Sequence, residues 1–206
     1  MKLLAWVYVV VLLIGTTEIG AAPLYQAGEK GSVSRSLLHG EISAGYVLSS
    51  HKIEYTTGED ASPRLKGAEM RALWTPLPWL SVGADFEKLG NEKLSPLVKQ
   101  YGVRRWAGIV KLTLSPNTSP RLYLIGGYGK SKHEIKYDFQ ARWFPPVTQR
   151  WTYWMLGLGL ETNVWKGIFV AGEGSWIHYN NDCLTSFFKI SSRTEMDLRL
   201  RMGLRF

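Results

Sequence analysis

The chain has 206 residues, which is enough for one domain with a buried core, and it carries a formal net charge of +8. Its single cysteine, Cys183, excludes an intramolecular disulfide and a zinc site built from cysteines. The basic balance favours an anionic lipid or polysaccharide as partner, and the sequence contains no motif for nucleic acid.

The first residues have the pattern of a secretory signal. A positive start is followed by an apolar run from Leu3 to Ile14 and then by small and polar residues. This pattern predicts cleavage after Ala21, so we expect a signal peptide over residues 1–21. The run is too short for a spanning helix, and no later segment approaches the roughly 20 apolar residues that such a helix needs.

Apolar residues alternate with polar or small residues in eight later segments, which is the period of a β-strand. The segments cover residues 41–49, 67–75, 79–87, 105–114, 122–129, 153–161, 168–176 and 193–206. The last one is the clearest, because its apolar positions alternate with charged residues and Gly203 up to a final aromatic residue. One face of each strand is therefore expected to be apolar and the other polar.

The connections between these segments alternate in length. Long polar connections follow the first, third, fifth and seventh segments, and short turns such as 76–78 and 115–120 follow the others. Eight antiparallel strands with all short turns at one end predict an up-and-down barrel. Residues 22–36 have no period, so we expect a short leader before a barrel domain over residues 37–206.

Aromatic residues gather at both ends of the apolar face, in two belts. The short-turn end has Trp74, Trp79, Trp165 and Phe206, and the end toward the long connections has Phe86, Trp106, Tyr128, Trp154 and Trp176. Amphipathic rings settle at the two interfaces of a bilayer, with aliphatic residues between them. The belts therefore favour a barrel that crosses a membrane.

The period of two does not by itself say which face is outside. If the apolar face meets lipid, nearly balanced charges fill the interior and pair with one another, and eight strands leave room only for side chains. The residues expected to form these interior ion pairs are Glu41, Glu69, Arg71, Asp85, Arg105, Lys111, Glu161, Glu173, Asp197, Arg199, Arg201 and Arg205. The alternative is a soluble secreted barrel of the lipocalin type, with an apolar interior.

The signal sequence, the eight alternating segments and the terminal amphipathic strand resemble small bacterial outer-membrane proteins of the OmpA/OmpX type, over residues 37–206. The resemblance implies an all-β, eight-stranded antiparallel transmembrane β-barrel, monomeric and surrounded by outer-membrane lipid. In that family the barrel-assembly machinery reads the last strand. The residues that match its signal are Leu200, Met202, Leu204 and Phe206, although Gly203 does not stand at the usual spacing.

Enzymatic chemistry has one candidate residue. Lipid A-modifying barrels similar to this one use a histidine, a serine and a carboxylate near the bilayer edge, and His178 lies at the outer end of its segment. Ser175 falls on the opposite face, which favours His178 as an interfacial polar residue. No metal-binding spacing of histidines occurs, so neither a metal nor a cofactor is expected. A lipid A-modifying enzyme and a narrow channel remain alternatives.

The third long connection combines basic and aromatic residues, which suits phosphates and sugars. The residues expected to bind lipopolysaccharide or a host surface are Lys130, Lys132, Lys136, Arg142, Trp143 and Arg150. An ordinary solvated loop is the alternative. The sequence thus predicts a non-enzymatic barrel that serves envelope integrity and surface interaction through its loops.

Overall fold

The computed structural model describes residues 39–50, 53–55, 60–61, 64–91, 98–137, 147–180, 183–184, 188–190 and 194–206. The expected signal peptide and leader lie outside these ranges, as do Arg142 and Trp143, so the predictions on them stay predictions. In the part of the chain that is described, no helix is long and apolar enough to cross a membrane.

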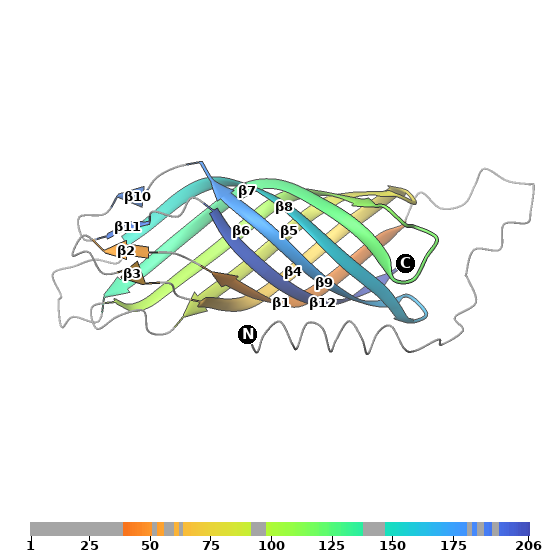
Figure 1. The fold of residues 1–206 in the computed structure, drawn as a ribbon, viewed down its shortest axis with the longest axis horizontal. Coiled ribbons are helices and arrows are strands. Elements are labelled where there is room, and N and C mark those ends of the chain that lie inside the picture. Colours follow the sequence, from red (N-terminus) through yellow and green to blue (C-terminus); the bar gives the residue numbers. More distant parts are fainter. Residues whose placement is uncertain are drawn as a thin grey trace, which may run out of the picture. The chain divides into compact units, whose positions relative to one another are not determined.

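Eight antiparallel strands close into a barrel (Figure 1), which confirms the predicted fold class. The barrel strands are β1 (Gly40–Ser50), β4 (Arg64–Leu77), β5 (Leu80–Asn91), β6 (Val98–Thr113), β7 (Arg121–Tyr137), β8 (Val147–Trp165), β9 (Ile168–Tyr179) and β12 (Thr194–Arg205). Each barrel strand pairs with the next one along the chain, and β12 pairs with β1 to close the seam. This is the up-and-down order.

Four short strands form a second sheet from the first and fourth long connections. Its order is β10 (Cys183–Leu184), β11 (Phe188–Ile190), β2 (Ile53–Tyr55) and β3 (Asp60–Ala61). The central pair is antiparallel, with Phe188 opposite Tyr55 and Lys189 opposite Glu54. The two connections that flank the β1–β12 seam are therefore joined to each other.

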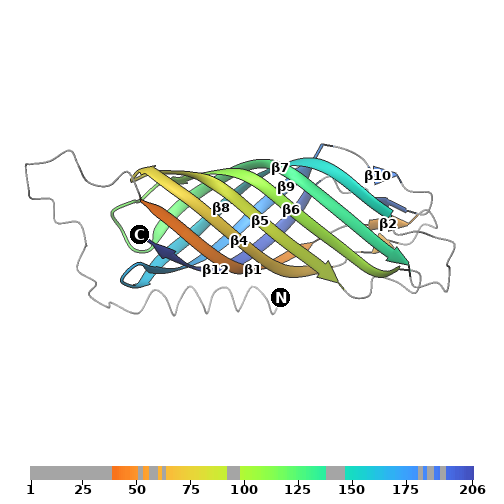
Figure 2. The same cartoon turned by 180° about the vertical axis from the view of Figure 1, so that it is seen from behind.

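The short turns and the end of β12 lie at the other end of the barrel (Figure 2). In the turn between β8 and β9, Gly167 has a φ of 75°, which glycine adopts without the steric cost of a side chain. At the seam, the Gly40 N–H donates to the Phe206 carbonyl at 2.9 Å and the Phe206 N–H donates to the Gly40 carbonyl at 3.0 Å. The last residue is thus hydrogen-bonded into the barrel wall.

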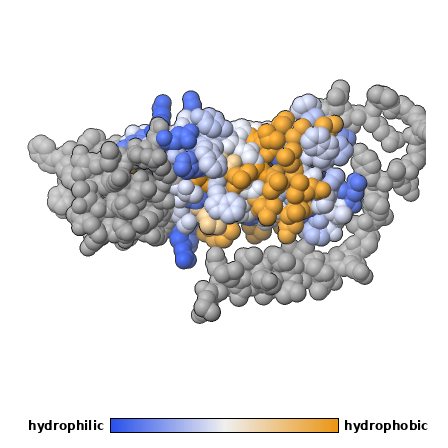
Figure 3. Space-filling view, turned by 45° about the horizontal axis from the view of Figure 1, so that its top comes forward, coloured by the Kyte–Doolittle hydropathy of each residue, from blue (hydrophilic) through white to orange (hydrophobic). Residues whose placement is uncertain are grey.

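The apolar face of the barrel is on the outside. Leu156, Leu200 and Leu204 are 51%, 56% and 58% exposed, whereas Arg71 and Glu173 on the inner face are at most 4% exposed. All nine aromatic residues of the two predicted belts are exposed. Figure 3 shows the apolar band, with strongly hydrophilic groups at its margin toward the long connections. The lipocalin-type alternative is wrong, because a soluble barrel would bury this apolar face.

The interior changes character along the barrel. Toward the long connections it holds a buried apolar and aromatic cluster that includes Leu65, Tyr101, Ile135 and Trp151. His133 lies within this cluster: its Nδ1 is 2.7 Å from the Tyr101 hydroxyl, and its ring centroid is 3.9 Å from that of Trp151. Toward the short turns charged side chains share the interior with apolar ones. Side chains therefore fill both halves.

The strands β6, β7 and β8 extend well beyond the predicted segments. Lys130, Lys132 and Lys136 lie on β7 and Arg150 lies on β8, so the expectation that they belong to a loop is wrong. The reason is that beyond the aromatic belt the pattern inverts: the outward positions become polar, and inward positions such as Ile135 become apolar.

Candidate functional site

Arg199 lies at the centre of the charged interior. Its Nη1 is 2.8 Å from Glu173, its Nη2 is 2.6 Å from Glu87 and 2.8 Å from Asp197, and its Nε is 3.2 Å from Glu69. Glu173 lies on β9 and Glu87 lies on β5, which are on opposite sides of the barrel. The guanidinium of Arg199 therefore links the two sides. Hydrogen-bonded partners are what make a buried charge tolerable.

Three further arginines complete this network. Arg71 contacts Glu173 and Asp85, each at 2.9 Å. Arg105 lies 2.8 Å from Glu87 and 2.9 Å from Asp197. Arg201 Nη2 contacts Glu173 and the Tyr123 hydroxyl, each at 2.5 Å, and its Nε lies 3.1 Å from Glu69. Each carboxylate of this layer thus contacts at least one guanidinium group.

A second ion cluster lies nearer the short turns. Lys111 Nζ is 2.9 Å from Glu41 and 2.6 Å from Glu161, and Arg205 reaches the same two carboxylates at 3.1 and 2.8 Å. With these contacts, every residue expected in an interior ion pair faces inward and has a partner of opposite charge. The arrangement is that of a plugged barrel.

Three buried carboxylates, of Glu69, Asp85 and Glu87, bring oxygen atoms within 4.8 Å of one another. Such a group could ligate a cation in isolation. Here each carboxylate already contacts the guanidinium group of an arginine, which offsets its charge. The cluster is therefore part of the ion network.

His178 does not meet Ser175, the serine nearest to it in the sequence. Its Nδ1 is 3.3 Å from the Thr194 hydroxyl, and its ring lies beside Trp154 with centroids 5.2 Å apart, both on the outer face. Ser175 faces the interior, where its hydroxyl accepts a hydrogen bond from Arg199. A base and a nucleophile on opposite faces of a strand cannot cooperate in acyl transfer.

Four basic residues on the outer face form one continuous row across four strands. Lys88 on β5 lies opposite Arg104 on β6, Arg104 lies opposite Lys132 on β7, and Lys132 lies opposite Arg150 on β8. Directly opposite residues on antiparallel strands bring their Cβ atoms to about 5 Å. We call Lys88, Arg104, Lys132 and Arg150 the basic row.

The basic row lies immediately beyond the outer aromatic belt. Phe86 and Trp106 are two residues from Lys88 and Arg104 on the same faces of β5 and β6. Because successive same-face residues are about 7 Å apart along a strand, the charges stand at the height of lipid headgroups if the rings mark the bilayer interface.

Like charges directly opposite each other on a sheet are destabilising unless something offsets them. The outward acidic side chain among the described residues of β4 to β8 is Glu134, which pairs with Lys132 at 2.5 Å. More positive charge surrounds the row on the same outer face, from Arg64, Lys66, Lys130 and Lys136. The region has a strong excess of positive charge and suits an anion.

The expected binding residues divide between this face and the undescribed part of the chain. Lys132 and Arg150 belong to the basic row, and Lys130 and Lys136 lie on the same face of β7. Sequence reasoning missed Lys88 and Arg104, since only the strand register brings them beside Lys132. Their place two residues beyond an aromatic belt residue was the available signal.

The residues of the expected assembly signal lie on the outer face at the end of the chain. Leu200, Met202, Leu204 and Phe206 are all exposed. This orientation is what recognition of the strand from outside would need, and the recognition itself stays a prediction.

Solved structures of several bacterial outer-membrane proteins share this architecture. Neisserial surface protein A aligns with a TM-score of 0.57 at 11% identity over 81% of this chain and 97% of that one. OprG from Pseudomonas aeruginosa gives 0.56 at 9% identity over 82% and 95%. The attachment invasion locus protein Ail from Yersinia pestis gives 0.51 at 16% identity over 82% and 98%. The chain has the fold of the small outer-membrane β-barrels.

No protein-family model matches the sequence, and neither does any curated protein. At identities of 9 to 16%, this outer-membrane barrel fold is what the chain shares with the three proteins, so the site must be argued from its own residues.

Proposed function

We propose that the chain is a non-enzymatic barrel of the bacterial outer membrane that supports envelope integrity by binding the phosphates of lipopolysaccharide. The observation that carries this function is the basic row. Its four side chains face outward from the barrel wall, and an outer-membrane barrel is surrounded on that side by lipopolysaccharide.

The position of the row favours a membrane lipid over a soluble ligand. The row lies beside the aromatic belt and points away from the barrel axis, toward the surrounding lipid. Guanidinium groups bind phosphate through two parallel hydrogen bonds, and ammonium groups bind it as point charges. Alternating Lys and Arg can therefore hold adjacent phosphates.

Holding lipopolysaccharide would contribute to envelope integrity in a simple way. Phosphates in the outer leaflet repel one another, and a fixed row of cations on a barrel wall offsets that repulsion locally. The interior filled with paired charges is consistent with a structural role.

The test is a titration of the folded barrel, in zwitterionic detergent, with lipid A. We expect the variant Lys88→Gln, Arg104→Gln, Lys132→Gln, Arg150→Gln to bind about a thousandfold more weakly, because a basic side chain near an anionic surface contributes about 1 kcal/mol. The charge-matched control for one residue of the row, Lys132→Gln, is Lys166→Gln at an exposed turn at the other end of the barrel. It should lose far less.

Equal losses in the two single variants would show that net charge, and not the row, attracts the lipid, and would contradict the proposal. A second contrary outcome concerns sulfated sugars, since Ail was solved in complex with the heparin analogue sucrose octasulfate. If the wild-type barrel binds that compound but not lipid A, the ligand is a soluble polyanion instead.

A further inference from the structure

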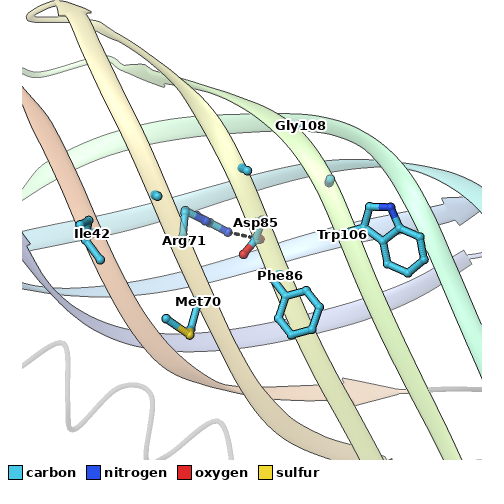
Figure 4. A pocket seen from close by; sticks show the side chains of 10 residues that line it. Ile42, Met70, Arg71, Asp85, Phe86, Trp106 and Gly108 are labelled. Atoms are coloured by element: carbon cyan, nitrogen blue, oxygen red, sulfur yellow. Dashed lines mark hydrogen bonds and ion pairs between the residues drawn. The ribbon is translucent and has the colours of Figure 1, made fainter.

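A hollow lies in the apolar band on the same side of the barrel as the basic row (Figure 4). Its floor consists of small residues in one cross-strand row, because Ala72 lies opposite Ala84 and Ala84 lies opposite Gly108. The hollow has a volume of about 500 Å³. That volume lies within the range of ligand sites in proteins, about 300–1,000 Å³.

Larger side chains bound the hollow on the side of the basic row. Met70, Phe86 and Trp106 form the next cross-strand row, and all three are exposed. Figure 4 shows these side chains standing out from β4, β5 and β6. A flexible thioether and two rigid rings make a wall that can adapt to a flexible apolar chain.

Packing within the barrel does not require the small residue at the end of the floor. A Cβ added to Gly108 would meet no atom within 4 Å, whereas one added to Gly129 on β7 would lie 2.1 Å from the Trp106 carbonyl oxygen. Gly129 is thus needed for the strands to approach, and Gly108 is not. Its absent side chain leaves space open toward the lipid.

The hollow and the basic row are built on the same strands at a fixed separation. Toward the long connections, Lys88 stands four residues from Ala84 on β5, and Arg104 stands four residues from Gly108 on the antiparallel β6. All four lie on the outer face. At the rise of a β-strand this separation is about 13 Å. A phosphate on the two cations and an apolar chain in the hollow are therefore within reach of one molecule.

We propose that the hollow holds one acyl chain of a lipid A molecule whose phosphate is bound by Lys88 and Arg104. This inference rests on the proposed function and adds a second, apolar contact to it. The other half of the basic row, Lys132 and Arg150, is available to the second phosphate of the same disaccharide. The occupant is lipid A because its phosphates and several acyl chains match both parts of the site.

The acyl chain would be held by close packing. Moving it from the surrounding lipid into the hollow gives no hydrophobic free energy, because the lipid and the lining of the hollow are equally apolar. The hollow should accordingly add little to the affinity for lipid A. Its main effect is to fix the position of one acyl chain against the barrel wall. Filling the hollow should weaken binding without changing any charge.

The test fills the floor with the double variant Ala84→Leu, Gly108→Leu and measures lipid A retained by the detergent-solubilised barrel in native mass spectrometry. We expect retention to fall about fivefold, a loss of about 1 kcal/mol, because the contacts that are lost are dispersion contacts. Binding of the deacylated, phosphorylated sugar should be unchanged. The matched control is Gly172→Leu on β9, which is also exposed and has no atom within 4 Å of an added Cβ.

Folding of each variant is checked by the heat-dependent shift in gel mobility, and Gly108→Leu alone decides if the double variant does not fold. Unchanged retention of lipid A would overturn the inference, as would equal retention of a two-chain phospholipid or a second copy of the chain cross-linked at the hollow. If neutralising the basic row leaves lipid A binding intact, the proposed function fails. If neutralising the basic row weakens lipid A binding but filling the hollow does not, the proposed function stands and the acyl-chain site is wrong.

Discussion

The two sides of the outer rim differ in chemistry although they share one interior. On β4 to β8, the described outward positions beyond the aromatic belt carry the basic row and further basic residues. On β9, β12 and β1, the corresponding described positions carry His178, opposite Thr194, and Ser50, opposite Met196. Among the residues that the structure describes, the outward basic charge beyond the belt is thus on one side of the rim.

The interior shows the opposite distribution. Arg199 on β12 contacts Glu87 on β5 and Glu69 on β4, so the ion network crosses from the neutral side to the basic side. The stability of the barrel depends on ion pairs between residues from the whole circumference, whereas binding at the outer surface depends on residues from a few neighbouring strands. Substitutions should therefore separate stability from binding.

The largest effect is expected from removal of the shared interior contact. Arg199→Leu leaves four buried carboxylates without that partner, and loss of one member of a buried ion pair costs about 3–5 kcal/mol. Urea unfolding in lipid vesicles measures the change in free energy. Lys166→Gln, at an exposed turn, is the control and should stay within about 0.5 kcal/mol of the wild type.

A smaller effect should follow from giving the neutral side a pair of cations. His178 and Thr194 are opposite each other on the outer face, so His178→Lys with Thr194→Lys creates two adjacent ammonium groups. At about 1 kcal/mol each, they should add a second, weaker lipid A molecule per barrel. Native mass spectrometry counts the bound molecules. An unchanged count would mean that the basic side binds through more than its charge.

The smallest effect is expected at the acidic neighbour of the basic row. Glu134→Gln releases Lys132 from its partner, and exposed ion pairs are worth about 0.2–1 kcal/mol. Lipid A should bind about two- to fourfold more tightly in the same titration. Weaker binding would show that Glu134 positions Lys132 instead of competing for it.

The strands and their faces could be predicted because apolar residues such as Leu198 and Leu200 keep a strict period of two across the bilayer. The strand limits could not, since beyond the belt Lys132 and Lys136 point outward while His133 and Ile135 point inward. The period of two continues there, but the polar residues face outward and the apolar residues face inward. A stretch without an apolar outer face is therefore interpreted as a loop.

The candidate site was predicted only in part for a related reason. Lys132 and Arg150 stood out as basic residues in one stretch, whereas Lys88 and Arg104 are distant from them in the sequence. The basic row exists through the register of β5, β6, β7 and β8, and a single sequence contains no direct record of register.

The seam between β1 and β12 has a consequence for how the barrel forms. Glu41 lies opposite Arg205, 164 positions away in the sequence, and the two side chains also share a hydrogen bond. Contacts so distant carry a high loop-closure entropy and form slowly. We therefore expect the seam to close late, and until it closes both edge strands are open to pairing with another chain. If the β2–β11 pairing forms first, it should shorten the search for that last register, because it brings the two flanking connections together.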